Sequence, residues 1–114
     1  MSIPVKIIAT GHYIPKRAVY SVDLDTKFGF DLGYIERRNG VVKRHVAEQK
    51  EGETTSMMGV WATEAALNQA GYTADMLDLI IFASAGPEQG LPDTAPLIQA
   101  KLGLGSSGIA CFSV

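Results

Sequence analysis

Apolar positions near the C-terminal end of the chain fall into two short runs, the first unbroken and the second interrupted only by Ser113. The first covers residues 79–83 and the second residues 109–114. Runs of this length predict strands that are covered on both faces by helices. Between them lies a helical pattern that begins at Asp93 or Thr94, runs to Leu102 and is closed by Gly103. Strand, helix and strand in this order predict two parallel strands joined by a crossover.

A longer helical pattern precedes the first of these strands. It begins at a cap formed by Thr54, Thr55 or Ser56 and runs to about Ala70, where Gly71 ends it. Apolar residues cover most of its circumference, so we expect this helix to be largely buried. Alternation of helices with buried strands indicates the α/β class.

The first half of the chain has shorter and weaker patterns. Ser21 is a candidate cap for a short helix, and Asn39-Gly40 is expected to stop a second one. The predicted elements are a strand over 5–9, helices over 22–27 and 31–38, a strand over 41–46 and a surface loop over 47–53. No repeat or linker divides the chain.

Composition and charge narrow the setting. Hydrophobic residues make up 46% and charged residues 19%, which is typical of a globular protein. A net charge of −2 gives no electrostatic reason to expect nucleic acid or a membrane surface as partner. One cysteine excludes an internal disulfide, and no signal peptide or membrane-spanning pattern is present. We therefore expect a cytoplasmic protein.

Three possible sites have simpler explanations. Residues 103–108 spell G-x-G-x-x-G, but a helix precedes this stretch and a strand follows, the reverse of a dinucleotide site. Cys111 lies inside an apolar strand, where a thiol has a packing role. His12 and His45 have no metal-ligating residues at ligand spacing, so no metal site is predicted.

A local basic cluster leaves two interpretations open. It consists of Arg37, Arg38, Lys43 and Arg44, and Tyr34 precedes Arg38 by one helical turn. That spacing places a ring and a guanidinium on one side of a helix, where they can grip a ligand with a flat base and phosphates. Alternatively, the cluster is a solvated charged face, partly neutralised by Glu36 and Glu48.

Several stretches, taken in order, resemble the ketoacyl-ACP synthase III family of thiolase-fold condensing enzymes. The R-x-G-[IV]-x-x-R pattern from Arg38 to Arg44 is the strongest single element. The stretches are Ile7 to Pro15, Ile35 to His45, Met58-Gly59, Ala70-Gly71, Asp78 to Ser84, Leu91-Pro92 and Cys111 to Val114. Together they span essentially the whole chain.

The resemblance implies a thiolase-like fold. It also implies an acyltransferase that condenses an acyl-CoA starter with malonyl-ACP through a cysteinyl thioester. Residues 1–114 would form the N-terminal part of the first thiolase-like half-domain, with a parallel or mixed sheet and flanking helices. The last strand stops without a cap or polar tail, so we expect the chain to continue in a longer protein. The catalytic Cys, His and Asn of the family would lie beyond Val114, and Cys111 does not match the nucleophile. The chain alone is therefore expected to be inactive.

The resemblance also implies ligands. Arg38 matches an arginine that meets acyl-CoA, Tyr34 matches a tryptophan that stacks on adenine, and Leu91 matches an apolar residue that reaches the partner subunit's acyl pocket. Acyl-CoA is a substrate here, so no cofactor is implied; acyl carrier protein and a second subunit, in a homodimer, are the implied partners. Phe30 stands where relatives often have a small polar residue that contacts the CoA.

These departures leave the role of the parent enzyme open. An enzyme that initiates fatty-acid biosynthesis and a specialised relative in secondary metabolism are equally consistent with the residues. A different class also remains: a non-catalytic thiolase-fold subunit that serves as a dimer partner or an acyl-binding module.

Overall fold

A computed structural model describes all residues from 1 to 114. The chain forms two compact units: residues 1–13 with 54–114 make the larger, and residues 14–53 make the smaller. This division does not coincide with any linker-like stretch of sequence.

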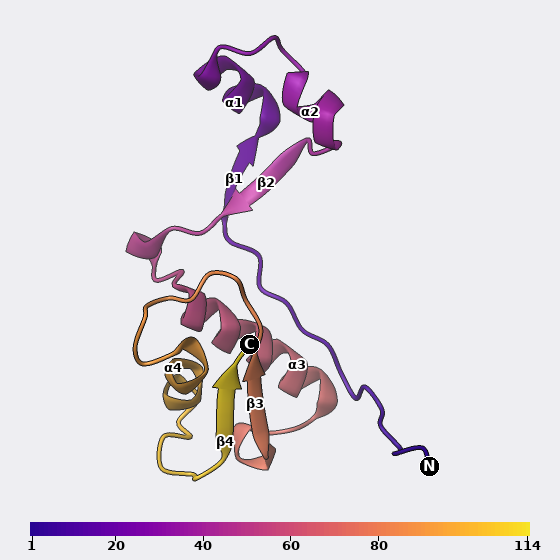
Figure 1. Ribbon diagram of the computed structural model, residues 1–114, viewed down its shortest axis with the longest axis vertical. Helices are drawn as coiled ribbons and strands as arrows, with labels where there is room; N and C mark the ends of the chain where they lie inside the picture. Colours follow the sequence, from indigo (N-terminus) through magenta and orange to yellow (C-terminus); the bar gives the residue numbers. More distant parts are fainter. The chain divides into compact units, whose positions relative to one another are not determined.

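The larger unit contains the predicted pair of parallel strands. Its elements are helix α3 (Thr55–Ala70), strand β3 (Leu79–Phe82), helix α4 (Thr94–Lys101) and strand β4 (Ala110–Ser113), with a short 3-10 turn over Ala74–Met76. Strands β3 and β4 run parallel, with Leu79 opposite Ala110 and Phe82 opposite Ser113 (Figure 1). The strand–helix–strand prediction is therefore confirmed.

Cover on both faces of these strands was predicted, and for this chain it is wrong. Helix α4 contacts β3 and β4 on the face where Ile80 and Phe82 are half-buried. On the other face Leu79 is 46% exposed, Ile81 55% and Phe112 46%. An apolar run has the same pattern whether one or two layers cover it, and the larger unit provides a covering helix on one side only.

Helix α3 begins and ends as predicted. The Thr54 hydroxyl accepts a hydrogen bond from the backbone N–H of Met57 at 3.3 Å, and Gly71 ends the helix with φ of 69°. The expectation that α3 is largely buried is only partly met, because Ser56 and Val60 are buried while its other apolar residues are mostly half-buried.

Two glycines allow other segments of the larger unit to lie close against α3. A Cβ added to Gly59 would lie 2.8 Å from Ile98 Cδ1, so this glycine lets α4 lie directly against α3. A Cβ on Gly11 would lie only 2.4 Å from Ala62 O and Ala66 N, which belong to the backbone of α3. The segment that precedes Gly11 therefore runs along the helix.

The strand predicted over residues 5–9 does not form. The segment has no strand beside it, and Val5 and Ile7 are 85% and 86% exposed. A β-branched run becomes a strand only when a neighbour takes its backbone hydrogen bonds. Four residues after this segment, the Tyr13 ring lies 4.5 Å from the Trp61 ring and holds the chain against α3.

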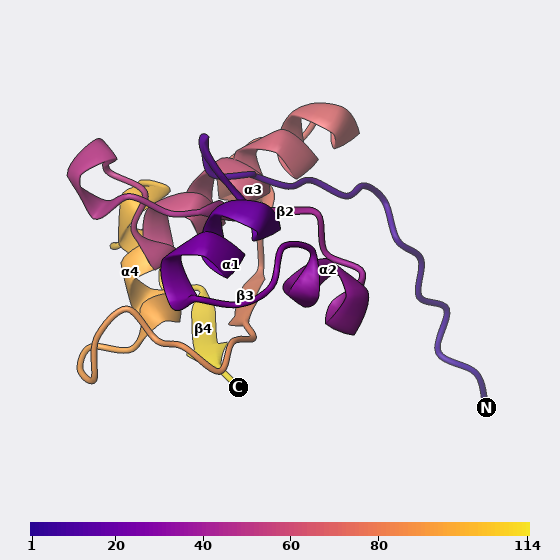
Figure 2. The same cartoon turned by 90° about the horizontal axis from the view of Figure 1, so that it is seen from above.

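The smaller unit is a two-stranded hairpin that carries two short helices. Its elements are strand β1 (Arg17–Tyr20), helix α1 (Ser21–Phe28), helix α2 (Tyr34–Asn39) and strand β2 (Lys43–Val46), followed by a 3-10 turn over Gln49–Glu51 (Figure 1). Helices α1 and α2 are also seen in Figure 2. The strands are antiparallel, with Arg17 opposite Val46. Three elements match the predictions with shifted boundaries, while β1 was not predicted.

The capping role predicted for Ser21 is wrong. Ser21 is the first residue of α1 and is buried, and its hydroxyl donates to the carbonyl of Val41. Tyr20 occupies the cap position without a side-chain bond. The serine hydroxyl instead joins α1 to the segment that enters β2, a contact between residues 20 positions apart that a local pattern does not contain.

Candidate functional site

Tyr34 and Arg38 lie together on helix α2, as their spacing predicts. The Arg38 guanidinium carbon is 5.5 Å from the centre of the Tyr34 ring. Arg38 Nε also donates to the Tyr34 hydroxyl at 3.3 Å. Tyr34 is half-buried and Arg38 is exposed. An aromatic ring and a fixed positive charge are thus presented side by side, an arrangement that suits a planar, anionic ligand.

A second ring extends this aromatic surface. The Phe30 ring lies 4.9 Å from that of Tyr34 with the planes tilted by 39°. Phe28 follows at 6.2 Å from Phe30, and Lys27 lies 5.7 Å from the Phe28 ring. Phe30 thus adds an apolar neighbour to Tyr34.

The loop before α2 is held by a buried carboxylate. Asp25 is 0% exposed. Its Oδ2 accepts from the backbone N–H of Gly33 at 2.8 Å, and its Oδ1 accepts from that of Ile35 at 3.1 Å. The two bonds fall on either side of Tyr34. No local sequence pattern marks Asp25, because its partners lie 8 and 10 positions away.

The basic cluster does not act as one group. Arg37 donates to the carbonyl of Leu32 at 3.1 Å, and Arg44 donates to the Ser21 hydroxyl at 3.2 Å. Glu48, expected to neutralise the cluster, forms an ion pair with Arg17 at 3.2 Å instead. Of the cluster, only Arg38 lies beside the Tyr34 ring.

Leu91 belongs to the larger unit, on the loop between β3 and α4, and is 89% exposed. The same loop is anchored at Glu88, whose backbone N–H donates to the Thr94 hydroxyl at 3.1 Å. The Glu88 carboxylate accepts from the backbone N–H of Ser56 at 2.6 Å and lies 3.8 Å from Lys101 Nζ. The exposed Leu91 side chain therefore lies on a loop whose backbone is held in place at Glu88.

This anchor perturbs the acidity of Glu88. Hydrogen bonding from the Ser56 side chain is the largest influence, and the Ser56 backbone N–H and the Lys101 charge add to it. Together they lower the pKa of the carboxyl below its ordinary value of 4.5, against the opposing effect of partial burial. Lys101 also donates to the buried Ser56 hydroxyl. Glu88, Ser56 and Lys101 thus form one polar network.

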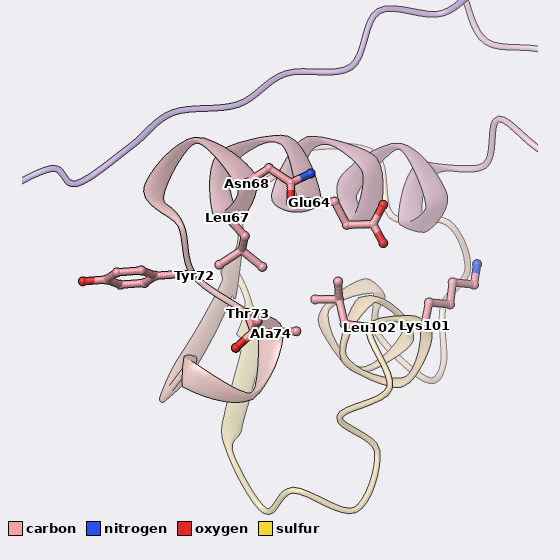
Figure 3. A pocket seen from close by; sticks show the side chains of 8 residues that line it. All are labelled: Glu64, Leu67, Asn68, Tyr72, Thr73, Ala74, Lys101 and Leu102. Carbon is pink, nitrogen blue, oxygen red and sulfur yellow. The ribbon is translucent and has the colours of Figure 1, made fainter.

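A shallow pocket lies between α3, the turn that follows it and the end of α4. Its lining residues are Glu64, Leu67, Asn68, Tyr72, Thr73, Ala74, Lys101 and Leu102 (Figure 3). Leu67 and Leu102 form its apolar part, while the Tyr72 ring projects away from the rest. Glu64 and Lys101 are its only ionisable groups besides the Tyr72 phenol.

The remaining sequence candidates have structural roles. Residues 103–108 form the loop from α4 to β4, as predicted. Cys111 is half-buried and its thiol donates to Gln99 Oε1 at 3.0 Å. His45 is exposed, and its Nδ1 lies 2.6 Å from the Pro15 carbonyl oxygen. No group of three or more His, Cys, Asp or Glu is placed to hold a metal ion. None of the helices is long and apolar enough to cross a membrane.

Comparison with known proteins shows what the chain is similar to over part of their length. A beta-ketoacyl-[acyl-carrier-protein] synthase III from Hyphomonas neptunium is 41% identical over 108 residues, which cover 95% of this chain and 32% of the relative. The chain is a partial homologue of these synthases. No family model matches it.

Solved structures agree with the sequence comparison. The 3-oxoacyl-[acyl-carrier-protein] synthase III from Aquifex aeolicus superposes with a TM-score of 0.84 at 35% identity, covering 96% of this chain and 34% of that structure. A priming beta-ketosynthase from a polyketide biosynthetic pathway gives 0.82 at 27% identity, covering 100% of this chain and 35% of that structure. The chain therefore has the thiolase fold in part and spans about a third of the length of these synthase III relatives.

Proposed function

We propose that the chain is the N-terminal portion of a beta-ketoacyl-ACP synthase III-like condensing enzyme. The proposal is supported by the identity to synthases III over 95% of the chain. The parallel pairing of β3 with β4 and the adjacent Tyr34 and Arg38 are consistent with it. In this proposal the parent enzyme is cytoplasmic and homodimeric, and it joins an acyl-CoA starter to malonyl-ACP.

Tyr34 and Arg38 receive the CoA part of the donor. The Tyr34 ring offers a face for the adenine, and the guanidinium of Arg38 pairs with a phosphate through its fixed fork of donors. Stacking of a base on an aromatic side chain contributes about 1–3 kcal/mol. Leu91, 89% exposed on its anchored loop, enters the acyl pocket of the partner subunit.

The chemistry belongs to residues beyond Val114. A cysteine thiolate attacks the thioester carbon of acyl-CoA, the bond from that carbon to the CoA sulfur breaks, and CoA leaves as its thiolate. Malonyl-ACP then loses carbon dioxide, and its enolate carbon attacks the cysteinyl thioester. The carbon–sulfur bond breaks, which forms the beta-ketoacyl-ACP and returns the thiolate. Since residues 1–114 supply none of the reacting groups in this scheme, the isolated chain is expected to have no condensing activity.

Acyl transfer from labelled donor tests the proposal directly. The full-length parent is incubated with radioactive acetyl-CoA and, separately, with radioactive longer and branched acyl-CoA donors, each without malonyl-ACP, and digested for peptide mapping. We expect one labelled cysteine, outside residues 1–114, and no label after that cysteine is changed to alanine. A folded parent that binds CoA but takes up no label would refute the enzymatic proposal and support the non-catalytic acyl-binding subunit.

The choice of pathway is separable from the choice of reaction. The similarity to a priming beta-ketosynthase of a polyketide pathway supports a secondary-metabolic parent as well as a fatty-acid one. Relative rates with acetyl-CoA and with longer or branched acyl-CoA donors distinguish the two: a strong preference for acetyl-CoA is expected of a fatty-acid initiation enzyme.

A further inference from the structure

The interior of the smaller unit is polar where α1 meets its neighbours. Among the residues of α1, only Ser21 and Asp25 are buried, and they lie one helical turn apart on the same face. Ser21 bonds the carbonyl of Val41 and is bonded by Arg44. Asp25 bonds the start of α2. Buried hydrogen bonds, rather than packed apolar side chains, therefore join α1 to β2 and α2.

Helix α2 depends on help from outside its own sequence. It has only six residues, and its cap position is Gly33, which has no side chain to bond the free N–H groups of the first turn. The Asp25 carboxylate takes this role by accepting from Gly33 and Ile35. A negative charge at a helix start is also favourable to the helix dipole.

The two backbone N–H groups that bond to Asp25 belong to the residues directly before and directly after Tyr34. With the N–H groups of residues 33 and 35 both fixed, the backbone at Tyr34 has little freedom to shift. Arg38 is then placed by its own contacts with Tyr34, the 3.3 Å hydrogen bond and the guanidinium beside the ring. One buried carboxylate thus determines where the ring and the guanidinium stand.

We infer that Asp25 is a positioning residue for the nucleotide part of the CoA donor, acting through the start of α2 on Tyr34 and Arg38. The inference rests on the proposed function, in which these two residues bind that part of the donor. Asp25 itself is fully buried and does not touch the ligand.

Coenzyme A and pantetheine binding, measured by calorimetry on the full-length parent, test this role. In Asp25→Asn one acceptor oxygen becomes an NH₂ donor, so one backbone N–H of the loop loses its partner. We expect CoA affinity to fall about tenfold, which lies within the range of about 5- to 150-fold that corresponds to the loss of one stacking contact. Binding of pantetheine, which lacks the nucleotide, should not change.

The sign of the effect separates positioning from electrostatics. Coenzyme A is polyanionic, so removal of a negative charge near its site would by charge alone tighten binding. Asp23→Asn is the matched control: the same change, on the same helix, at an exposed carboxylate. CoA binding that is unchanged or tighter in Asp25→Asn, or pantetheine binding weakened as much as CoA binding, would overturn the inference.

Arg38→Ala distinguishes the failure of this inference from failure of the proposed function. If Arg38→Ala leaves CoA affinity unchanged, the proposed nucleotide site is wrong. If it weakens CoA while Asp25→Asn does not, only the role of Asp25 is refuted. Should Asp25→Asn not fold, amide exchange in the wild-type parent decides. The N–H groups of Gly33 and Ile35 should exchange more slowly than in an unstructured peptide, and fast exchange of both would overturn the inference.

Discussion

Gly11→Ala tests the contact between the N-terminal segment and α3. A Cβ at this position would meet Ala62 O and Ala66 N at 2.4 Å, where ordinary van der Waals contact begins at 3.4 Å. Both atoms belong to the backbone in the middle of α3, so neither can move aside without damage to the helix. The N-terminal segment must therefore lift away from α3 to make room.

The cost of lifting is limited by what the segment contributes when it is bound. The tilted contact between the Tyr13 and Trp61 rings is worth about 0.5–1.5 kcal/mol beyond the area it buries. The exposed bond from the Thr10 N–H to Gln69 Oε1 adds at most about 1 kcal/mol. The apolar area that the segment buries against α3 adds to these two contributions, so we expect Gly11→Ala to lower the free energy of unfolding by about 1–3 kcal/mol, the range usual for overpacking.

Urea denaturation of the 114-residue chain, followed by the fluorescence of Trp61, its only tryptophan, measures this cost. Gly105→Ala is the matched control, because a Cβ there meets nothing within 4 Å and its backbone is not left-handed. Both substitutions reduce the freedom of the unfolded chain equally, so their difference isolates the clash. Equal stability of the two variants would refute the close approach of Gly11 to α3.

Three further predictions concern the Glu88 network, the end of α3 and Leu91. The lowered pKa of Glu88 means that its carboxylate stabilises the fold above pH 4.5, and that this contribution is lost as the pH falls through the folded-state pKa. Urea midpoints between about pH 3 and pH 6 should therefore fall less steeply in Glu88→Gln than in wild type; equal slopes would exclude this carboxylate as the source. Gly71→Ala places a side chain at φ of 69° and should cost about 1 kcal/mol in the same assay, with Gly71→Asn costing less. Leu91→Ala in the parent enzyme should shift its preference among acyl-CoA donors of different length without changing stability, since Leu91 is 89% exposed; an unchanged preference would argue against its role in the acyl pocket.

Local patterns predicted the elements that local chemistry determines. Thr54 and Gly71 mark the ends of α3 because a cap bond and a left-handed turn each involve residues only a few positions apart. The parallel pair β3 and β4 followed from two apolar runs on either side of a helix. The Tyr34–Arg38 contact followed from helical spacing alone.

The failures share a different cause, which is dependence on distant partners. Residues 5–9 look like a strand but have none beside them. Ser21 looks like a helix cap, yet its hydroxyl bonds Val41, 20 residues away. Asp25 belongs to no recognisable motif, because it bonds to the backbone of a loop that folds back against α1. Composition also cannot tell a strand covered on two faces from one covered on a single face.

Helix α4 covers only one face of β3 and β4, so polar residues are tolerated on the open face and not on the covered one. Ile80 and Phe82 lie on the side of α4, so a charge at either position removes contacts that hold the helix. Leu79 and Ile81 already meet water within this unit. Threonine or lysine at those two positions would preserve the contacts with α4 and reduce the exposed apolar area. Leu79 and Ile81 are therefore the positions to change when the isolated chain has to be kept in solution at high concentration.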